Sequence, residues 1–430
     1  MKKSVNQFLL RYGMHPDGID LEAGIREFVR QMEVGNAGKP EGLLMIPTYI
    51  RLDGELPKGE PVIVMDAGGT NFRAATVTFG EDGRAQVENF SKRPMPGTQG
   101  ELSAEAFFDT LAGILEPFEG VSDTVGFCFS FPTEILENGD GRLIHFNKEV
   151  KVRDMAGRVI GEGINEALKA RGLSEKRFVI LNDTVATMLG AIADYPDRDF
   201  DSYIGFILGT GTNTCYIEDC AAIGKLPDLN EGTMAVNMET GGFDGFPRGE
   251  IDRRFDETTA NCGDHVFEKM ISGAYQGSVI CMTAQQAARD GLFSPDAAEK
   301  LLALEDMTMR QIDAFCENRL SGNDLADLLA TDEDRETLFD LIDASFERAA
   351  KTVCVNIGAI LLHSGKGRDP KRPVCVSAEG TTFYKSVLFR PKLDAYVCSF
   401  LNETLGLYCE FVKTEDSTLV GSAVAGLLNR

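Results

Sequence analysis

The 430-residue sequence has no tryptophan, only four histidines and far fewer basic than acidic residues. Its 43 Lys and Arg against 67 Asp and Glu give a formal net charge of -24, which repels nucleic acids and anionic membranes, and no basic cluster offsets it. No apolar run approaches the roughly 20 residues of a membrane span. The longest candidate, residues 353–362, is short and contains the polar residue Asn356. We therefore expect no nucleic-acid partner and no membrane partner.

The cysteine pattern and the N-terminus both bear on the cellular compartment of the protein. Ten cysteines are scattered without a C-x-x-C pair, so neither a zinc site nor a disulfide framework is indicated. Residues 1–11 include basic side chains, but their apolar stretch is too short for a secretory signal and lacks a cleavage site. We expect a cytoplasmic protein whose mature chain starts here.

The length and composition predict a folded chain with two or three cores, because 43% hydrophobic and 26% charged residues are near the globular average. Strand and helix signals alternate along the first half, which is typical of an α/β fold. We expect a helical lead-in at 4–34, strands at 62–65, 73–79, 124–130, 178–181 and 203–208, and helices near 103–116, 158–171 and from 184.

The second half is predicted to be mostly helical at first. Residues 296–363 are acidic and helical in pattern, with a long amphipathic segment at 336–362. A last strand at 374–376 should end in a polar turn at 377–382, and a helix of small residues at 418–428 closes the chain.

A strand, Gly-rich turn, strand unit occurs twice. Gly68-Gly69-Thr70-Asn71 corresponds to Thr210-Gly211-Thr212-Asn213, each between two apolar strands. Such turns expose consecutive backbone N–H groups that can hold phosphate oxygens, although Asn and Gly are also common in ordinary hairpin turns. The repetition favours a nucleotide held from both sides, and neither turn has the pattern of a P-loop or a Rossmann motif.

Two acidic residues stand next to predicted turns or junctions. Asp66 precedes the first turn and can orient Mg²⁺ through water, while Arg73 follows it and can approach phosphate. Asp183 lies at a strand-to-helix junction, where it is either an N-cap or, because ligands bind at the carboxyl ends of strands in α/β proteins, the acceptor of a substrate proton.

Seven segments in one order together resemble the motifs of the hexokinase family. The first, Asp66 to Arg73, is similar to the family's first phosphate motif, and the last, Glu379-Gly380-Thr381, is similar to its adenosine motif. Between them lie the segments 127–132, 145–151, 181–188, 209–216 and 267–273. The resemblance implies a two-lobed actin-like ATPase fold of the ribonuclease H-like class, with the duplicated unit and an active-site cleft between the lobes.

The same resemblance implies the lobes and the reaction. The small lobe would comprise residues 61–184 plus 416–430, and the large lobe residues 1–60 plus 185–415. The protein would transfer the γ-phosphoryl group of Mg-ATP to the 6-hydroxyl of a hexose, with glucose expected. The alternatives are a kinase for another hexose or an N-acetylhexosamine, and a catalytically weak sugar sensor. Hexose preference, phosphoryl donor, regulation and oligomeric state stay open.

Site residues follow from the resemblance position by position. Asp183 would be the general base, and Lys148 a second catalytic residue. The sugar hydroxyls would be bound by Ser130, Asn147, Lys148, Asn182, Asp183, Asn213, Glu239 and Glu268. The nucleotide would be bound by Asp66, Gly68, Gly69, Thr70, Asn71, Arg73, Thr210, Gly380 and Thr381, with Asp66 near the metal. Without the resemblance, Ser130 would simply end a strand, Lys148 would be a surface lysine, Glu268 and Lys269 an exposed helix pair, and no histidine has an evident catalytic role.

Overall fold

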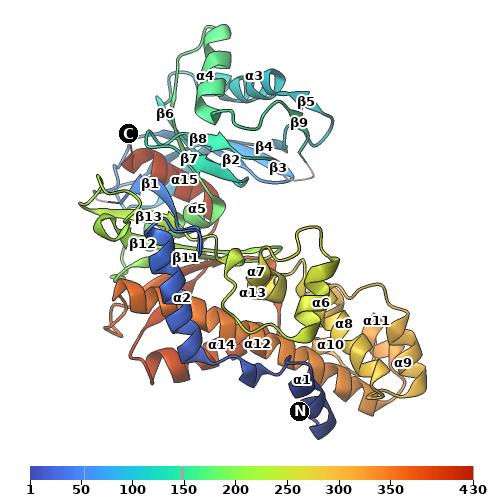
Figure 1. Ribbon diagram of the computed structural model, residues 1–430. Helices are drawn as coiled ribbons and strands as arrows, with labels where there is room; N and C mark the ends of the chain where they lie inside the picture. Colours follow the sequence, from blue (N-terminus) through green and yellow to red (C-terminus); the bar gives the residue numbers. More distant parts are fainter. Residues whose placement is uncertain (53, 147–149, 430) are drawn as a thin grey trace.

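The computed structural model describes residues 1–52, 54–146 and 150–429, and it contains two main β-sheets (Figure 1). The strands are β1 Ile46–Arg51, β2 Val62–Ala67, β3 Asn71–Phe79, β4 Ala85–Pro94, β5 Leu102–Ser103, β6 Thr124–Phe129, β7 Thr133–Ile135, β8 Gly141–Leu143, β9 Val152–Arg153, β10 Arg177–Leu181, β11 Tyr203–Leu208, β12 Thr212–Asp219, β13 Thr233–Asn237, β14 Val374–Glu379 and β15 Cys409–Val412. A five-stranded sheet has the order β10-β6-β2-β3-β4, and a six-stranded sheet has the order β1-β13-β12-β11-β14-β15.

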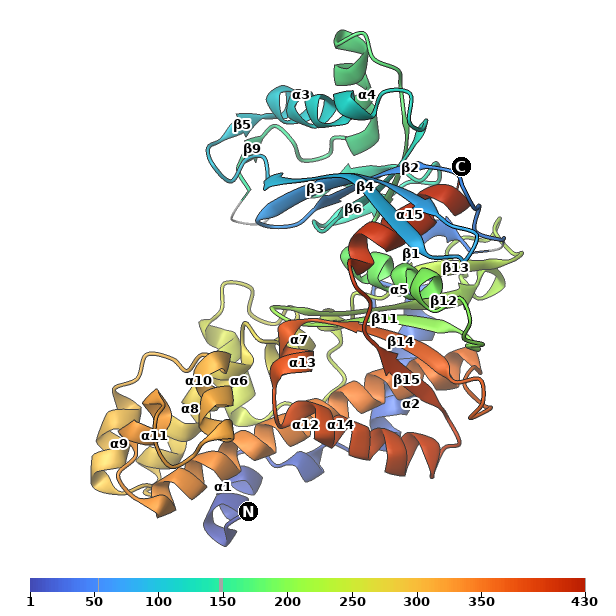
Figure 2. The same cartoon turned by 180° about the vertical axis from the view of Figure 1, so that it is seen from behind.

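Helices alternate with strands in the first half and dominate the second (Figure 2). They are α1 Lys3–Arg11, α2 Leu21–Asn36, α3 Ala104–Leu115, α4 Ile160–Ala170, α5 Asp183–Asp194, α6 Glu250–Thr258, α7 Val266–Ile271, α8 Gln276–Arg289, α9 Pro295–Leu302, α10 Met309–Glu317, α11 Asp324–Leu328, α12 Asp332–Ser364, α13 Thr381–Lys385, α14 Phe389–Tyr396 and α15 Ser417–Leu428. The predicted α/β class is confirmed. Within the described residues, no helix is long and apolar enough to cross a membrane.

The central strand β2 contributes side chains to the cores on both faces of the five-stranded sheet. Its residues are all buried because both faces of the sheet are covered. Alternate side chains enter different cores: Ile63 and Met65 pack with α3 and α4, while Val62 and Val64 pack with α5 and α15. In both views α3 and α4 lie on the outer side of this sheet, and α15 and α5 lie between it and the six-stranded sheet. The end of β10 and the helix α5 that follows it are therefore brought between the two sheets.

The duplicated unit is confirmed, because both predicted pairs are antiparallel hairpins. Ala67 faces Phe72 across the first turn, and Leu208 faces Thr212 across the second. Each turn is closed by a backbone hydrogen bond, from the N–H of Gly68 to the carbonyl of Asn71 at 3.0 Å and from the N–H of Gly209 to the carbonyl of Gly211 at 2.9 Å.

Two predicted elements have different bounds in the structure. The helical lead-in predicted at 4–34 consists of α1 and α2, which are separate because Gly13 has a positive φ of 67° and Pro16 begins a short 3-10 turn. The polar turn predicted at 377–382 is much shorter. Its first residues continue β14 to Glu379, because they pair with β11 up to Ile207, and Thr381 already begins α13.

Helix α15 packs on α5 at a glycine. A Cβ added to Gly421 would lie 1.8 Å from the carbonyl oxygen of Ala186, a backbone atom that cannot rotate away. We expect Gly421→Ala to destabilise the protein by about 1–3 kcal/mol, because the two helices must separate. Gly18→Ala is the matched control, since a Cβ there meets nothing within 4 Å. Equal urea midpoints for both variants would contradict this packing.

Candidate active site

Three parallel strands of the five-stranded sheet end side by side. Ala67 at the end of β2 pairs with Phe129 at the end of β6, and Leu181 at the end of β10 pairs with Cys128. The N–H of Ser130 also donates to the carbonyl of Ala67 at 3.1 Å. The predicted phosphate turn 68–71, Ser130 and the pair Asn182 and Asp183 therefore emerge from one edge of the sheet, where α/β proteins bind ligands.

The helix α5 is capped by Asn182 and not by Asp183. The side-chain oxygen of Asn182 accepts the N–H of Thr184 at 2.8 Å, and its backbone is extended, as an N-cap requires. The alternative in which Asp183 is merely the N-cap is therefore wrong. Asp183 is the first helical residue, and one of its oxygens also accepts the N–H of Thr184 at 2.8 Å.

Asp183 has an environment suited to accepting a proton. Desolvation by the surrounding protein raises its pKa to about 6, because it outweighs the hydrogen bond from the Thr184 N–H, and the nearby carboxylates of Glu239 and Asp66 act in the same direction as desolvation. A carboxylate with such a pKa is ionised at neutral pH yet basic enough to take a proton from an attacking hydroxyl.

The six-stranded sheet supplies a chain of amides ending in a carboxylate. The Asn213 side-chain N–H₂ donates to Oδ1 of Asn237 at 2.8 Å, and the Asn237 N–H₂ donates to Oε1 of Glu239 at 2.7 Å. Glu239 has a left-handed backbone with φ of 56°, which turns the chain directly after β13. Burial raises the pKa of Glu239. These groups offer both donors and acceptors to sugar hydroxyls.

Glu268 on α7 is fixed against the second Gly-rich turn. Its Oε2 accepts the N–H of Thr212 at 2.9 Å. Gly211 makes room for it, because a Cβ there would lie 2.5 Å from that oxygen. Desolvation raises the pKa of Glu268 despite this hydrogen bond. The turn that was predicted to bind phosphate thus also positions Glu268, which was predicted to bind the sugar.

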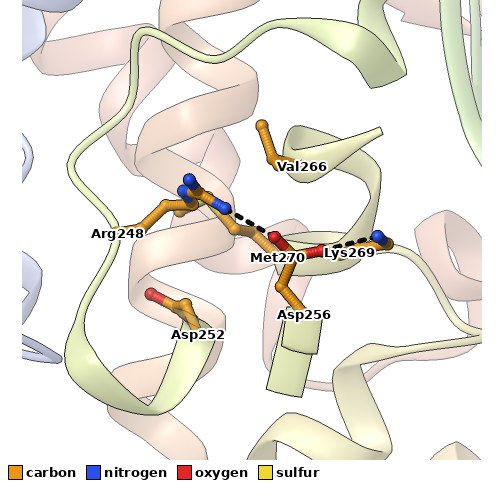
Figure 3. Close-up of a pocket in the computed structure, with 6 residues that line it drawn as sticks. All are labelled: Arg248, Asp252, Asp256, Val266, Lys269 and Met270. Carbon is orange, nitrogen blue, oxygen red and sulfur yellow. Dashed lines mark hydrogen bonds and ion pairs between the residues drawn. The ribbon is translucent and has the colours of Figure 1, made fainter. Parts of the chain in front are cut away.

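The residue after Glu268 belongs to a buried ion-pair cluster, and Figure 3 shows how it lies. Lys269 Nζ is 2.6 Å from Asp256 Oδ1, Arg248 lies 2.9 Å from the other oxygen of Asp256, and Lys269 also donates to the Asn261 carbonyl at 2.7 Å. Lys269 is only 3% exposed. The alternative of an exposed Glu268 and Lys269 pair is therefore wrong, and the cluster ties α7 to α6.

A cavity of about 650 Å³ lies where these residues meet. Six of the predicted sugar-binding residues line it: Ser130, Asn182, Asp183, Asn213, Glu239 and Glu268. Asn147 and Lys148 lie outside the described residues. Its volume is within the usual range of small-molecule sites.

The same cavity is lined by polar residues that the sequence did not single out, including Asn237, Asn261 and His265. Asn237 had a usable signal, because it ends an apolar strand as Asn182 does. His265 and Asn261 had none, since they reach the cavity only through the packing of α7 on α6.

A second cavity of about 290 Å³ contains the predicted phosphate ligand Arg73 and again Asp183. Thr187, Glu379, Ser417 and Thr418 also line it. Arg73 Nε donates to Asp66 Oδ2 at 2.8 Å, and Arg73 also donates to the Thr418 hydroxyl at 2.8 Å. Asp66 is therefore paired with Arg73 rather than free.

The remaining predicted nucleotide residues lie in the two Gly-rich turns and at the start of α13, and they are not among the described residues that line this cavity. Gly380 has φ of 113°, and a Cβ there would be 2.1 Å from the carbonyl oxygen of Leu208. The Thr382 hydroxyl donates to the Gly209 carbonyl at 3.1 Å. The adenosine-type turn at Gly380 and Thr381 is thus packed directly on the second Gly-rich turn, which contains Thr210. Gly68, Gly69, Thr70 and Asn71 form the first turn, next to Ser130.

Comparisons with known proteins agree with this arrangement. Two family models described as hexokinase match residues 11–193 and 203–428. Hexokinase-3 of Oryza sativa subsp. japonica is 32% identical over 89% of this chain and 81% of its own length, and the Hexokinase-like 1 protein of Arabidopsis thaliana is 31% identical over 90% and 83%.

Solved structures show the same fold. A hexokinase crystal structure has a TM-score of 0.79 at 21% identity and covers 99% of this chain and all of its own. Hexokinase from Schistosoma mansoni complexed with glucose has a TM-score of 0.74 at 20% identity and covers 98% and 99%. The resemblance and the two-lobed actin-like fold inferred from the motifs are thereby confirmed, and the chain belongs to the hexokinase family.

Proposed function

We propose that this sugar kinase transfers the γ-phosphoryl group of Mg-ATP to the 6-hydroxyl of glucose, its preferred hexose. The observation that carries the proposal is that Asp183 lines both cavities. One cavity holds amides and carboxylates suited to hydroxyl groups, and the other holds Arg73 beside the Gly-rich turns. A group at their junction can touch the attacking hydroxyl and the transferred phosphoryl group together.

The proposed mechanism uses Asp183 as the general base. Its carboxylate takes the proton of the 6-hydroxyl while that oxygen forms a bond to the γ-phosphorus, and the bond from the γ-phosphorus to the β,γ-bridging oxygen breaks to release ADP. Asn213, Glu239 and Glu268 orient the ring by its other hydroxyls. This orientation brings the two reacting atoms into line.

Magnesium fits this site as part of the nucleotide complex. Within the described ranges, no group of three or more His, Cys, Asp or Glu side chains is arranged to hold a metal ion. Mg²⁺ commonly binds substrate phosphates, waters and only one or two carboxylates, so a full protein cage is not required. Asp66 would face its water shell, and the ion would neutralise charge on the phosphoryl oxygens.

The pH dependence of turnover tests the base. Because Asp183 has a pKa of about 6 and acts only when deprotonated, kcat/KM for glucose should fall as the pH drops through 6 and level off above it. Rates measured from pH 5 to 8 in buffers of constant ionic strength check this. A rate unchanged down to pH 5 would contradict the proposed base.

A coupled assay of sugar-dependent ADP release tests the acceptor. Glucose, fructose, mannose, galactose and N-acetylglucosamine are compared with Mg-ATP held saturating, and glucose is expected to have the highest kcat/KM. A higher value for N-acetylglucosamine would favour an N-acetylhexosamine kinase. Glucose binding without ADP release would favour a sugar sensor.

We also propose a cytoplasmic location and the lobe division 61–184 plus 416–430 against 1–60 plus 185–415. The location is supported by all ten cysteines having free thiols. The lobe division is supported by two cores that each belong to one of the sheets, and a third core, around α5 and α15, joins the two.

A further inference from the structure

Thr187 has a buried hydroxyl without a partner. The residue lies on α5, is 1% exposed, and its Oγ1 has no hydrogen bond to any residue that the structure describes. Buried hydroxyls are nearly always hydrogen-bonded, because an unsatisfied one loses its hydration without compensation. An exception of this kind in a cavity wall leaves a donor available to a ligand.

Other hydroxyls on helices of this chain bond to their own backbone. Thr283 donates to the carbonyl of Val279 at 2.7 Å, and Ser422 donates to that of Thr418 at 2.6 Å. Each bond reaches back one helical turn, which is the common arrangement for Ser and Thr within helices. Thr187 does not make the equivalent bond to the carbonyl of Asp183. Its hydroxyl is therefore not committed to the helix.

The position of Thr187 identifies the ligand chemistry. It lies one turn after Asp183 and so on the same face of α5. It lines the 290 Å³ cavity, as Arg73 and Thr418 also do. Helix α5 lies between α15 and the six-stranded sheet in both views. A phosphoryl group paired with Arg73 in this cavity would offer acceptor oxygens to the Thr187 hydroxyl.

We propose that Thr187 contacts the phosphoryl donor: its hydroxyl donates a hydrogen bond to a phosphoryl oxygen of the bound nucleoside triphosphate. This rests on the proposed function of the cavity. The hydroxyl is unsatisfied in the free enzyme and satisfied in the complex, so it contributes to nucleotide binding and positioning at the expense of the stability of the free protein.

The test compares Thr187→Val, which has the same shape without the hydroxyl, with Thr187→Ser, which retains it. The Val variant should lower kcat/KM for Mg-ATP by about 10- to 100-fold, the usual effect of one hydrogen bond to a charged group. Its glucose affinity should be unchanged, and its urea midpoint should equal or exceed that of the wild type. The Ser variant should stay near wild-type activity.

Thr352→Val is the control, because Thr352 is also fully buried but donates to the Ala349 carbonyl at 2.9 Å, far along the sequence in α12. It should lower the urea midpoint and leave kcat/KM for Mg-ATP intact. Two results would overturn the proposal: Thr187→Val with wild-type kcat/KM, or Thr187→Val and Thr187→Ser both losing activity together with stability.

Binding of a non-hydrolysable Mg-ATP analogue, measured by calorimetry, separates this inference from the proposed function. If the wild type shows no sugar-dependent turnover, the proposed function fails. The Thr187 proposal then stands or falls on whether Thr187→Val weakens analogue binding by the same 10- to 100-fold.

Discussion

Asp183→Asn is expected to lower kcat for hexose phosphorylation by about 10²- to 10⁴-fold, the usual contribution of a general base. The amide retains hydrogen-bonding capacity toward a sugar hydroxyl but does not accept its proton. Glucose should therefore still bind with nearly the same dissociation constant. Single-turnover assays and calorimetry on the same preparation measure both quantities.

Asp194→Asn provides a matched control for this prediction. Asp194 ends the same helix and undergoes the same chemical change, but it is exposed and lines neither of the two cavities described above. It should keep wild-type turnover. If Asp183→Asn retained turnover, Asp183 would not be the base, and a loss of glucose binding in that variant would mean that it holds the sugar instead.

Asp256→Ala is expected to cause the largest loss of stability, about 3–5 kcal/mol. Asp256 is 5% exposed, and its removal leaves Lys269 buried without a counter-charge and takes away the acceptor for the Gly263 N–H. Because α7 carries Glu268, the KM for glucose should rise as well. Urea denaturation and the glucose dependence of the rate measure the two effects.

The control for Asp256 is Asp296→Ala. Asp296 pairs with Lys300 at 2.8 Å, but the side chains are 60% and 45% exposed, so its loss should cost less than about 1 kcal/mol. Similar urea midpoints for the two variants would show that burial does not strengthen the Asp256 cluster.

Asp256 should stabilise the protein less at acid pH than at neutral pH. Desolvation alone would raise the pKa of Asp256, but Lys269, the Gly263 N–H and Arg248 outweigh it and hold that pKa below its usual value. The stabilisation is therefore present above the pKa of the unfolded chain and is lost as the pH falls through the lower, folded value. The stability difference between wild type and Asp256→Ala should shrink at acid pH.

Local patterns explain which strands could be predicted. The apolar runs at 62–65 and 203–208 were sufficient to predict β2 and β11. Strands that are buried on both faces have such runs. Strand β4 has mostly exposed residues, so it shows no apolar pattern. Strand β1 contains Pro47 and is held by its pairing with β13, far along the chain. Their formation depends on neighbours that the local sequence does not reveal.

Some residues of the candidate site could also be predicted from local patterns, and others could not. Ser130, Asn182 and Asp183 follow apolar strands, so their shared edge could be predicted from strand order. The choice between Asn182 and Asp183 as the cap could not, because adjacent Asn and Asp both favour that position. The burial of Lys269 depends on Asp256, thirteen residues earlier on another helix. His265 enters the cavity only through that packing.

The position of the transferred phosphate tests whether Asp183 activates the 6-hydroxyl. Glucose, Mg-ATP and the enzyme are incubated together, and the product is identified by ³¹P and ¹³C NMR, with 6-deoxyglucose as a parallel substrate. We expect glucose 6-phosphate and ADP in equal amounts, with 6-deoxyglucose competing for binding but gaining no phosphate. Phosphate on another carbon, or phosphorylation of 6-deoxyglucose, would contradict the placement of the 6-hydroxyl beside Asp183.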